Sequence, residues 1–564
     1  MWPTQELVQT PLFQLHNEGL PLNERIALSY KRAKAISDAY RLTAKDLLTL
    51  SPKFWQLHTD PIWAVDGAAG TLVTLQYNCC AGTLAMFART QPEIQPTLKK
   101  VLDFDISGQF CLTEVGHGLD VFHLETTATL LPDGGFEINT PHDRAAKYMP
   151  PTAPVGVPCV AIVFARTLIR GEDCGIKPFL IELHNGKDMS PGVVCKVLPQ
   201  RGGSRPVNHS LTYFHNVQVP FSALLGTDAK ADDPRTAFFT NISRVAVGTI
   251  AIGSLGIPAL QVASVIASKY SNRRTVVDAQ GVRKSIMSFQ TQKIPIMSAV
   301  AQSFVMQALH HKCVSLFCNL KLDPRVRHAV ASTLKLVMIE HAQTAHLTLG
   351  DRCGAQGLFE VNQLTGMHSD MRGTAIAEGD LLGISIRLGT ELLLGRYSLP
   401  ETTDPNSLLA KHELGLFREM RERMSEMEHH RSPEYDQIVL PELVNLVQAV
   451  GHRIAYDAAV EAKLEPYLLD MYVASCVKVD LHWYVENLGL TRREYRNMER
   501  AAVEAIYPRL DDLLARMNVD AYVTAPFTSD QKWDEYLGTL ETFGLPSENL
   551  TSQLGSTSFP GHYA

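Results

Sequence analysis

The sequence predicts a mostly helical α+β protein with four parts: an N-terminal helical domain, a central antiparallel β domain, a four-helix bundle and an extra C-terminal helical domain. Two observations carry this prediction: long helical segments dominate both ends of the chain, and short β-rich runs gather in one stretch between them. The length of 564 residues corresponds to roughly three to four domains at ~150 residues each. With 45% hydrophobic and 20% charged residues, the composition excludes a disordered chain, a collagen and a small disulfide scaffold.

The first two domains are expected at residues 1–106 and 107–235. The first is mainly helical, with helices at 23–40 and 92–102. In the second, turn residues such as Pro132-Asp-Gly-Gly135 separate short β-rich runs. These runs lie at 136–140, 159–164, 178–182 and 211–219, and the last alternates apolar side chains with the period of a half-buried strand.

Helices return after residue 235. Four long segments predict an antiparallel bundle within 236–400, at 240–269, 284–320, 326–350 and 374–396. The stretch 245–268 carries no charged residue, and we interpret it as a buried bundle helix instead of a membrane span. A linker at 398–406 precedes a C-terminal helical domain at 407–564.

Charge and cysteine usage restrict the class of partner. The 52 basic and 59 acidic residues give a net charge of −7, so no basic field is available for nucleic acid. The ten cysteines form no C-x-x-C pair and no His cluster accompanies them, so we expect no metal site. The N-terminus lacks the pattern of a secretory signal, and the end of the chain differs from the Ser-Lys-Leu type of address. We therefore expect an intracellular protein, cytoplasmic or peroxisomal.

One segment is informative about chemistry: Gly108-Gln-Phe-Cys-Leu-Thr-Glu-Val-Gly-His-Gly118. Dinucleotide-binding G-x-G-x-x-G, P-loop and G-x-S-x-G motifs are absent. The segment resembles the flavin-pocket run of the acyl-CoA oxidase and acyl-CoA dehydrogenase family, closest to the oxidase branch. Further matching motifs follow in the family's order across about 110–400, namely Ile138-Asn-Thr-Pro141, Lys147-Tyr-Met-Pro150, Val217-Gln-Val-Pro220, Arg273-Arg274, Phe289-Gln-Thr-Gln292, Cys353-Gly-Ala-Gln-Gly357 and Ala377-Glu-Gly379.

The resemblance implies an FAD cofactor and assigns several residues to it. A threonine beside a glycine turn can present a hydroxyl and backbone N–H groups to a flat polar ring. Thr113 would then contact the pyrimidine edge of the flavin, with Gly118 in the same turn. Arg273 or Arg274 would reach the pyrophosphate of the neighbouring subunit's FAD, near Gln290, Gln292 and Gly354. Such a shared site implies a homodimer or a higher homo-oligomer.

The resemblance also implies that Glu378 is the catalytic base. Removing a proton next to a thioester carbonyl needs a carboxylate that is held dry and close to the carbon, and desolvation strengthens such a base by raising its pKa. In the family the equivalent glutamate takes the α-proton while the β-carbon gives a hydride to the flavin. The alternative is a glutamate that only favours the start of a helix.

The chain departs from the family pattern at three places. After Lys147 it has Met149-Pro-Pro-Thr152 where oxidases have Trp-Pro-Gly-Gly, and Pro151 has no N–H for the flavin. Thr152 can replace that glycine only through its backbone. The second departure is Cys353-Gly-Ala-Gln-Gly-Leu358, where the family usually has Cys-Gly-Gly-His-Gly-Tyr. The third is the run Asp380-Leu-Leu after Glu378-Gly379, in place of an Asn-Thr type pair. Together they predict a diverged member with altered substrate or cofactor geometry.

The sequence supports several hypotheses about the function. The leading one is an FAD enzyme that forms the 2,3-enoyl product from an acyl thioester, with O₂ reoxidising the flavin to give H₂O₂. A close rival is a dehydrogenase that passes its electrons to an electron-transferring protein. The substrate could instead be a polyketide-derived or carrier-bound acyl chain in place of an acyl-CoA. A third hypothesis is that the protein is a non-redox scaffold that kept the fold and lost the flavin.

Overall fold

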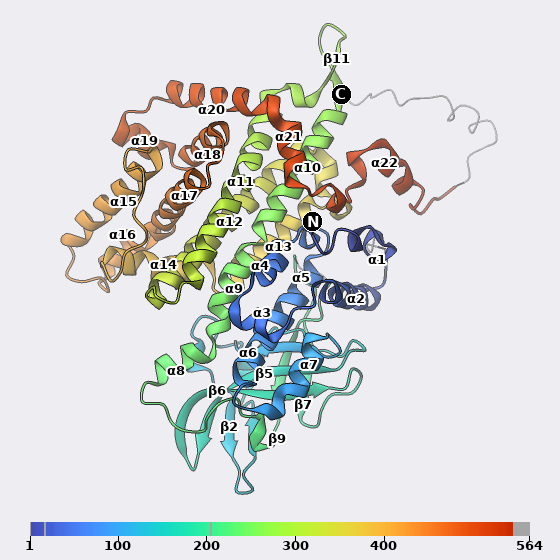
Figure 1. The fold of residues 1–564 in the computed structure, drawn as a ribbon, viewed down its shortest axis with the longest axis vertical. Coiled ribbons are helices and arrows are strands. Elements are labelled where there is room, and N and C mark those ends of the chain that lie inside the picture. Colours follow the sequence, from blue (N-terminus) through green and yellow to red (C-terminus); the bar gives the residue numbers. More distant parts are fainter. Residues whose placement is uncertain (1, 16–18, 204–205, 545–564) are drawn as a thin grey trace.

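The computed structural model describes residues 2–15, 19–203 and 206–544. Helices form one large body, and the β strands form a second layer at one end of it (Figure 1). The N-terminal helices lie across the junction between the two. They are α1 (Pro11–Gln14), α2 (Leu22–Tyr40), α3 (Ala44–Thr49), α4 (Pro52–His58), α5 (Gly67–Thr74), α6 (Gly82–Phe87) and α7 (Gln95–Leu102), with a π-helical turn at Leu75–Ala81 between α5 and α6.

The strands divide into two sheets. They are β1 (Ser107–Cys111), β2 (Thr127–Leu130), β3 (Phe136–Asn139), β4 (Lys147–Tyr148), β5 (Cys159–Ile169), β6 (Glu172–His184), β7 (Val193–Val197), β8 (Ser210–Phe214) and β9 (Val217–Val219). The larger sheet has the order β1-β5-β2-β3-β9 with β6 paired to β5, and the smaller one has the order β4-β8-β7.

Two details of the predicted β domain were wrong. The larger sheet is mixed, because β1 and β2 both run parallel to β5. Long connections separate these strands in the chain, which permits parallel pairing, and residue alternation carries no information about strand direction. The run 211–219 is also two strands: Asn216 adopts φ +50°, so the chain turns between β8 and β9 and they join different sheets.

The bundle follows the sheet. Its helices are α8 (Pro234–Asn241), α9 (Ser243–Gly253), α10 (Gly256–Arg273), α11 (Gln290–Cys318), α12 (Pro324–Arg352), α13 (Leu364–Ile376) and α14 (Leu381–Leu393), with a hairpin of β10 (Thr275–Val277) and β11 (Arg283–Ser285) between α10 and α11. One helical stretch, Ser243–Arg273, is long and apolar enough to cross a membrane, and 94% of its most apolar window is buried inside the protein. It therefore packs as a core helix, as the sequence predicted.

The predicted fourth bundle helix is interrupted. Residues 374–396 were expected to be continuous, but α13 ends at Ile376 and α14 begins at Leu381. Glu378 and Gly379 lie between them with φ of +54° and +98°, values outside the helical region. Glu378 therefore belongs to a loop and does not open a helix.

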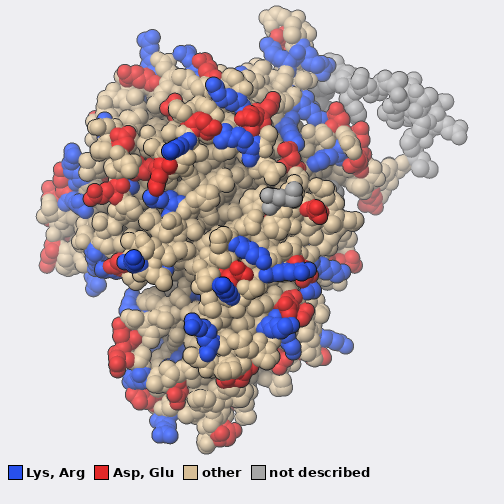
Figure 2. All heavy atoms as spheres, in the orientation of Figure 1, with Lys and Arg blue, Asp and Glu red and all other residues tan. Residues whose placement is uncertain are grey.

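The C-terminal helices cover the side of the bundle formed by α11, α12 and α14. They are α15 (Leu408–Ser425), α16 (Pro433–Ile438), α17 (Leu443–Glu461), α18 (Pro466–Val479), α19 (Leu481–Leu488), α20 (Arg492–Ile506), α21 (Leu510–Met517) and α22 (Asp530–Leu537). Figure 2 shows basic and acidic side chains interspersed over the visible face, without a broad area of one sign.

Candidate active site

The loop that carries Glu378 is fixed by side chains from two bundle helices. The ammonium of Lys335, on α12, donates to the backbone carbonyls of Ala377 and Gly379 on either side of it. The Thr249 hydroxyl, on α9, donates to the carbonyl of Glu378 itself over 2.9 Å. Three consecutive carbonyls are thus held, and these tertiary contacts maintain a backbone conformation that a glutamate rarely adopts.

The carboxylate of Glu378 points between a thiol and a glycine. The Cys79 thiol donates to Oε1 over 3.1 Å. On the other side, a β-carbon added to Gly248 would lie only 2.5 Å from the Glu378 carboxyl carbon, so the carboxylate occupies the space that the missing side chain leaves. Burial raises the pKa of Glu378 to about 7, and the Cys79 hydrogen bond and the charges of Lys335 and Arg244 oppose that rise.

Arg244 supplies positive charge from inside the protein. It is 5% exposed, and burial lowers the pKa of its guanidinium to about 10, so it stays charged at neutral pH. Its nitrogens donate to the carbonyl and side-chain oxygens of Asn78, each over 2.8 Å, and to the carbonyl of Leu47 over 3.0 Å. Gly82 leaves room for the guanidinium, because a β-carbon there would lie 2.4 Å from Nε.

The π-helical turn places Cys79 beside the carboxylate. Such turns add one residue to a helical turn and so redirect the side chains that follow. Gln76, in the same turn, donates to the carbonyls of Val101 and Ile106 and accepts from the N–H of Gly108 over 2.6 Å. The turn that holds the Cys79 thiol is therefore tied directly to the start of β1.

Sequence reasoning missed Cys79, Lys335, Arg244 and Thr249. One signal for Lys335 was present, because it is the single charged residue in the apolar stretch 329–339. A lysine there must be buried and needs partners. For Cys79 and Thr249 no sequence signal existed, since their roles arise only where the π-helical turn, α9 and the 377–380 loop meet.

The residues predicted for the flavin lie at two places. Thr113, partly exposed, donates its hydroxyl to the carbonyl of Tyr148 over 2.5 Å, which leaves its oxygen as an acceptor. Gly118 is exposed, with open space where a side chain would be. Its neighbour Leu119 packs near Gly383, so this turn adjoins the segment that follows Glu378.

Thr152 is completely buried, and its hydroxyl shares a hydrogen bond of 2.7 Å with that of Thr212. Its side chain is thus committed to the sheet, and the backbone alone is left for a ligand. Pro151 beside it is buried as well and offers no N–H.

Arg273 and Arg274 differ in whether their side chains already have partners. Arg273 donates to the Asp530 carboxylate over 2.7 Å and to the Phe527 carbonyl over 3.1 Å. Arg274 is exposed and makes no side-chain hydrogen bond or ion pair within the described part of the chain.

The remaining predicted residues meet where α11 begins and α12 ends. Arg352 donates to the carbonyl of Thr291 over 2.9 Å, and Gln292 donates to the carbonyl of Arg352 over 3.4 Å. The side-chain oxygen of Gln292 is buried without a partner. Gln290 is exposed, and Gly354 has φ +60° with open space around it. These exposed or unpartnered polar groups suit a charged, hydrogen-bonding ligand. Among the described residues, no hydrogen bond or ion pair joins this group to Glu378.

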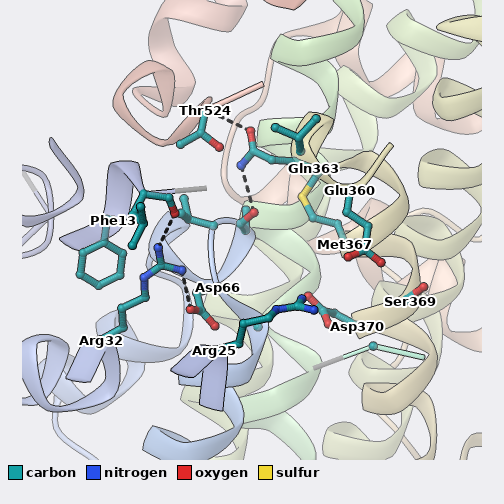
Figure 3. Close-up of a pocket in the computed structure, with 17 residues that line it drawn as sticks. Phe13, Arg25, Arg32, Asp66, Glu360, Gln363, Met367, Ser369, Asp370 and Thr524 are labelled. Atoms are coloured by element: carbon teal, nitrogen blue, oxygen red, sulfur yellow. Dashed lines mark hydrogen bonds and ion pairs between the residues drawn. The ribbon is translucent and has the colours of Figure 1, made fainter. Parts of the chain in front are cut away.

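A separate cavity of about 120 Å³ lies between α2, the start of α5 and α13 (Figure 3). Arg32 and Asp66 form a buried ion pair of 2.9 Å at its wall, and the Arg25 side chain points toward Asp370 across it. Acidic and basic groups both line it, and it contains neither Glu378 nor any residue predicted for the flavin.

Comparison with known proteins identifies relatives in both sequence and structure. A family model described as the acyl-CoA oxidase C-alpha1 domain matches residues 249–393. Human peroxisomal acyl-coenzyme A oxidase 3 is 27% identical over 315 residues, which cover 50% of this chain and 44% of that protein. Acyl-coenzyme A oxidase 2, peroxisomal, from Arabidopsis thaliana is 24% identical over 359 residues, 59% of this chain and 52% of its own. The chain thus spans about half the length of the curated relatives it matches.

The fold as a whole is also shared. The crystal structure of acyl-CoA oxidase1 from Yarrowia lipolytica covers 100% of this chain and 93% of its own, with a TM-score of 0.79 at 17% identity. At that identity the likeness concerns the fold, and it confirms the predicted mostly helical α+β class. Together with the family model over residues 249–393 and the sequence relatives, it shows that this chain is similar to acyl-CoA oxidases in fold and, over about half of its length, in sequence.

Proposed function

We propose that the protein oxidises an acyl thioester, in the first place an acyl-CoA, to its 2,3-enoyl thioester, with FAD as cofactor and O₂ as the final acceptor that yields H₂O₂. The observation that carries this proposal is the Glu378 carboxylate, whose pKa is raised to about 7 and whose backbone is fixed by Lys335 and Thr249. The names of the relatives, all acyl-CoA oxidases, support the same reaction class.

The groups predicted for FAD suit such a ligand. Arg274 is a charged side chain without a partner in the described chain, Gln292 keeps a buried acceptor without a donor, and the open backbone at Gly354 admits a close approach. Thr113 retains an acceptor oxygen for a ring N–H. Thr152 would contribute its backbone only. When bound, FAD supplies a two-electron acceptor for the hydride that leaves the β-carbon of the substrate.

Glu378 would accept the proton from the α-carbon of the thioester. A base with a pKa near the working pH combines a substantial ionised fraction with good proton affinity, and general-base catalysis contributes typically 10²–10⁴-fold in rate. Cys79 donates to the ionised carboxylate and orients it. Lys335 and Thr249 keep its backbone in place. Arg244 compensates the negative charge, and Lys335, whose pKa burial lowers to about 7, does so when it is protonated.

Apolar surface adjoins this base. Leu119, Ile376 and Leu382 are 74%, 67% and 56% exposed on the segments flanking Glu378 and the Gly118 turn. A contiguous exposed apolar patch marks a site that a ligand or another chain covers. We propose that these apolar side chains are covered by the acyl chain of the substrate and by the second subunit of a homodimer or higher oligomer.

The proposal extends to the second subunit and the compartment. Arg274, and not Arg273, would reach the FAD of the neighbouring subunit, because Arg273 is already paired with Asp530.

The human and Arabidopsis relatives are named as peroxisomal, and we propose an intracellular, peroxisomal or cytoplasmic, location for this protein.

The decisive test is spectroscopic. The purified protein should carry flavin absorption bands at about one flavin per chain, and anaerobic palmitoyl-CoA should bleach them. Admitting air should restore the bands and release H₂O₂. Bleaching that persists in air would instead indicate a dehydrogenase with a protein acceptor, and bleaching by carrier-bound chains alone would indicate a tailoring enzyme. A colourless protein that takes up no added FAD would refute the proposal and favour the hypothesis of a non-redox scaffold.

A further inference from the structure

Outside the Glu378 site, three buried metal-ligating side chains meet between the bundle and the C-terminal helices. His341 comes from α12, His452 from α17 and Cys476 from α18. They are 7%, 3% and 2% exposed, and one potential ligand atom from each lies within 4.8 Å of the other two. The three helices lie together on one side of the molecule (Figure 1).

Two ring nitrogens of this cluster lack partners. Nε2 of His341 and Nε2 of His452 are both buried without a hydrogen bond. Tyr472 lies one turn before Cys476 on the same face of α18, and its ring contacts both histidine rings. Leaving a buried polar group unpaired costs about 1–3 kcal/mol. Two such nitrogens beside a buried thiol therefore point to a bound group between them.

Close packing of the helices brings the two histidines together. A β-carbon added to Gly451 would lie 2.2 Å from Cγ2 of Val337, so α17 approaches α12 at a point where no side chain fits. His452 follows Gly451 directly, and His341 lies one turn after Val337 on α12. The imidazole rings consequently stack with centroids 5.2 Å apart.

We propose that His341, His452 and Cys476 bind a zinc ion. Imidazole nitrogen and thiolate sulfur are the ligands that Zn²⁺ prefers, in a tetrahedral arrangement. Zinc–ligand bonds of about 2.0–2.3 Å place such atoms roughly 3.5 Å apart, so closing the cluster from within 4.8 Å needs movements on the order of 1 Å. A fourth position remains for an oxygen donor, and the Tyr472 hydroxyl, beside the Cys476 thiol, borders the cluster.

A neutral imidazole offers a lone pair to a metal ion, and a thiol must lose its proton to bind one. Binding would replace the Cys476 thiol proton by the metal: Zn²⁺ and Cys–SH give a Zn–S bond and release one H⁺. The ion would join bundle helix α12 to α17 and α18, independently of the flavin chemistry.

The sequence predicted no metal site because the ligands lie at 341, 452 and 476, without a short spacing motif, and only the fold assembles them. A second cluster, of Glu114, His117 and Glu125, is a weaker candidate. Both carboxylate oxygens of Glu114 are already used, by Lys147 and by the N–H groups of Glu125 and Thr126, at 2.7–2.9 Å.

The test measures metal content and not activity. The full-length protein is stripped with a chelator, dialysed against ZnSO₄, desalted and analysed for zinc. We expect about one zinc per chain in the wild type and at least a fivefold lower content in Cys476→Ser and His452→Ala. Cys313→Ser and His346→Gln are matched controls that should keep the wild-type content, because both change buried residues outside the cluster.

A second measurement covers variants that fail to fold. Co²⁺ added to the stripped wild type should give the absorption of a thiolate-bound tetrahedral ion, and Zn²⁺ should displace it. Zinc should also raise the thermal midpoint of the wild type by several degrees, since it binds the folded state only. Three results would each overturn the proposal. The wild type could show no thiolate-bound Co²⁺, Cys476→Ser could take up as much zinc as the wild type, or His117→Ala could abolish zinc uptake.

Discussion

The thiol of Cys79 donates a hydrogen bond to the carboxylate of Glu378 over 3.1 Å, although 299 positions separate the two residues in the chain. The N-terminal region and the bundle therefore meet at this carboxylate. Cys79 orients the acid from one side, while Lys335 and Thr249 hold its backbone from the other. The strength of the proposed base thus depends on contacts between domains, and each contact can be tested separately.

Glu378→Gln should abolish dehydrogenation and leave the flavin bound. The amide is nearly isosteric with the carboxylate but cannot accept the α-proton, so kcat should fall by roughly 10²–10⁴-fold. Steady-state H₂O₂ release and the flavin spectrum are the two measurements. Unchanged turnover would remove Glu378 from the mechanism, whereas loss of the flavin itself would show a structural defect.

Cys79→Ala should shift the acidic limb of the pH profile of kcat/KM to higher pH. Glu378 acts as a base only when ionised, and the thiol hydrogen bond stabilises the ionised form and so lowers its pKa. Removing that bond raises the pKa, by about one unit for a loss of ~1.4 kcal/mol. Cys79→Ser keeps a donor and is the matched control. If Cys79→Ala and Cys79→Ser give the same profile, the thiol has no part in tuning the base.

Lys335→Met should also move the acidic limb upward, and it should lower kcat. The ammonium favours the charged carboxylate, and its two hydrogen bonds hold the carbonyls of Ala377 and Gly379. Without them the loop loses its fixed conformation, and a misplaced base costs on the order of 10²-fold.

Lys312→Met tests the same substitution on the surface of α11, where the lysine pairs with Glu461 over 2.6 Å. That variant should retain the wild-type profile. A Lys335→Met enzyme with an unaltered pH profile and a lower thermal midpoint would show that Lys335 acts on stability only.

Sequence reasoning reached the fold class because helical and strand periodicities depend on local residue patterns. It failed where tertiary contacts decide the backbone. Residues 374–396 are locally compatible with one helix, yet contacts from Lys335 and Thr249 stabilise a positive φ at Glu378 and break it. The direction of β5 relative to β1 is likewise set by the path of the chain and not by residue alternation.

The same distinction applies to the candidate site. The motif around Glu378 could be identified from the sequence, and its catalytic role stays a prediction. The choice between Arg273 and Arg274 could not be made, because it depends on Asp530 and Phe527, more than 250 residues later. The contacts of Cys79 were equally out of reach, since a π-helical turn has no distinct residue pattern.

Arg274→Ala should weaken FAD binding, whereas Arg273→Ala should not. A lost hydrogen bond to a charged phosphate group costs about 1.5–3 kcal/mol, which corresponds to roughly 10–100-fold in affinity. Arg273 instead pairs with an exposed carboxylate, so its loss should change the thermal midpoint only slightly. Titration of the flavin-free protein with FAD compares the two variants directly. Weaker binding in Arg273→Ala and not in Arg274→Ala would reverse the assignment.

Gly248→Ala should inactivate the enzyme without unfolding it. The added β-carbon would lie 2.5 Å from the Glu378 carboxyl carbon, which is closer than van der Waals contact allows. Since the opposing atoms belong to the end of a flexible side chain, the carboxylate is displaced while α9 keeps its packing. A displacement of about 1 Å can cost on the order of 10²-fold in rate.

Gly366→Ala is the matched control, because this glycine also lies within a helix and its added β-carbon would meet nothing within 4 Å. Activity, the flavin spectrum and the thermal midpoint should all stay at wild-type values in that variant. In Gly248→Ala, only activity should fall. That result would show that the Glu378 carboxylate reaches its position because Gly248 has no side chain. Full activity in Gly248→Ala would mean that the working position of the carboxylate differs from the one beside Gly248.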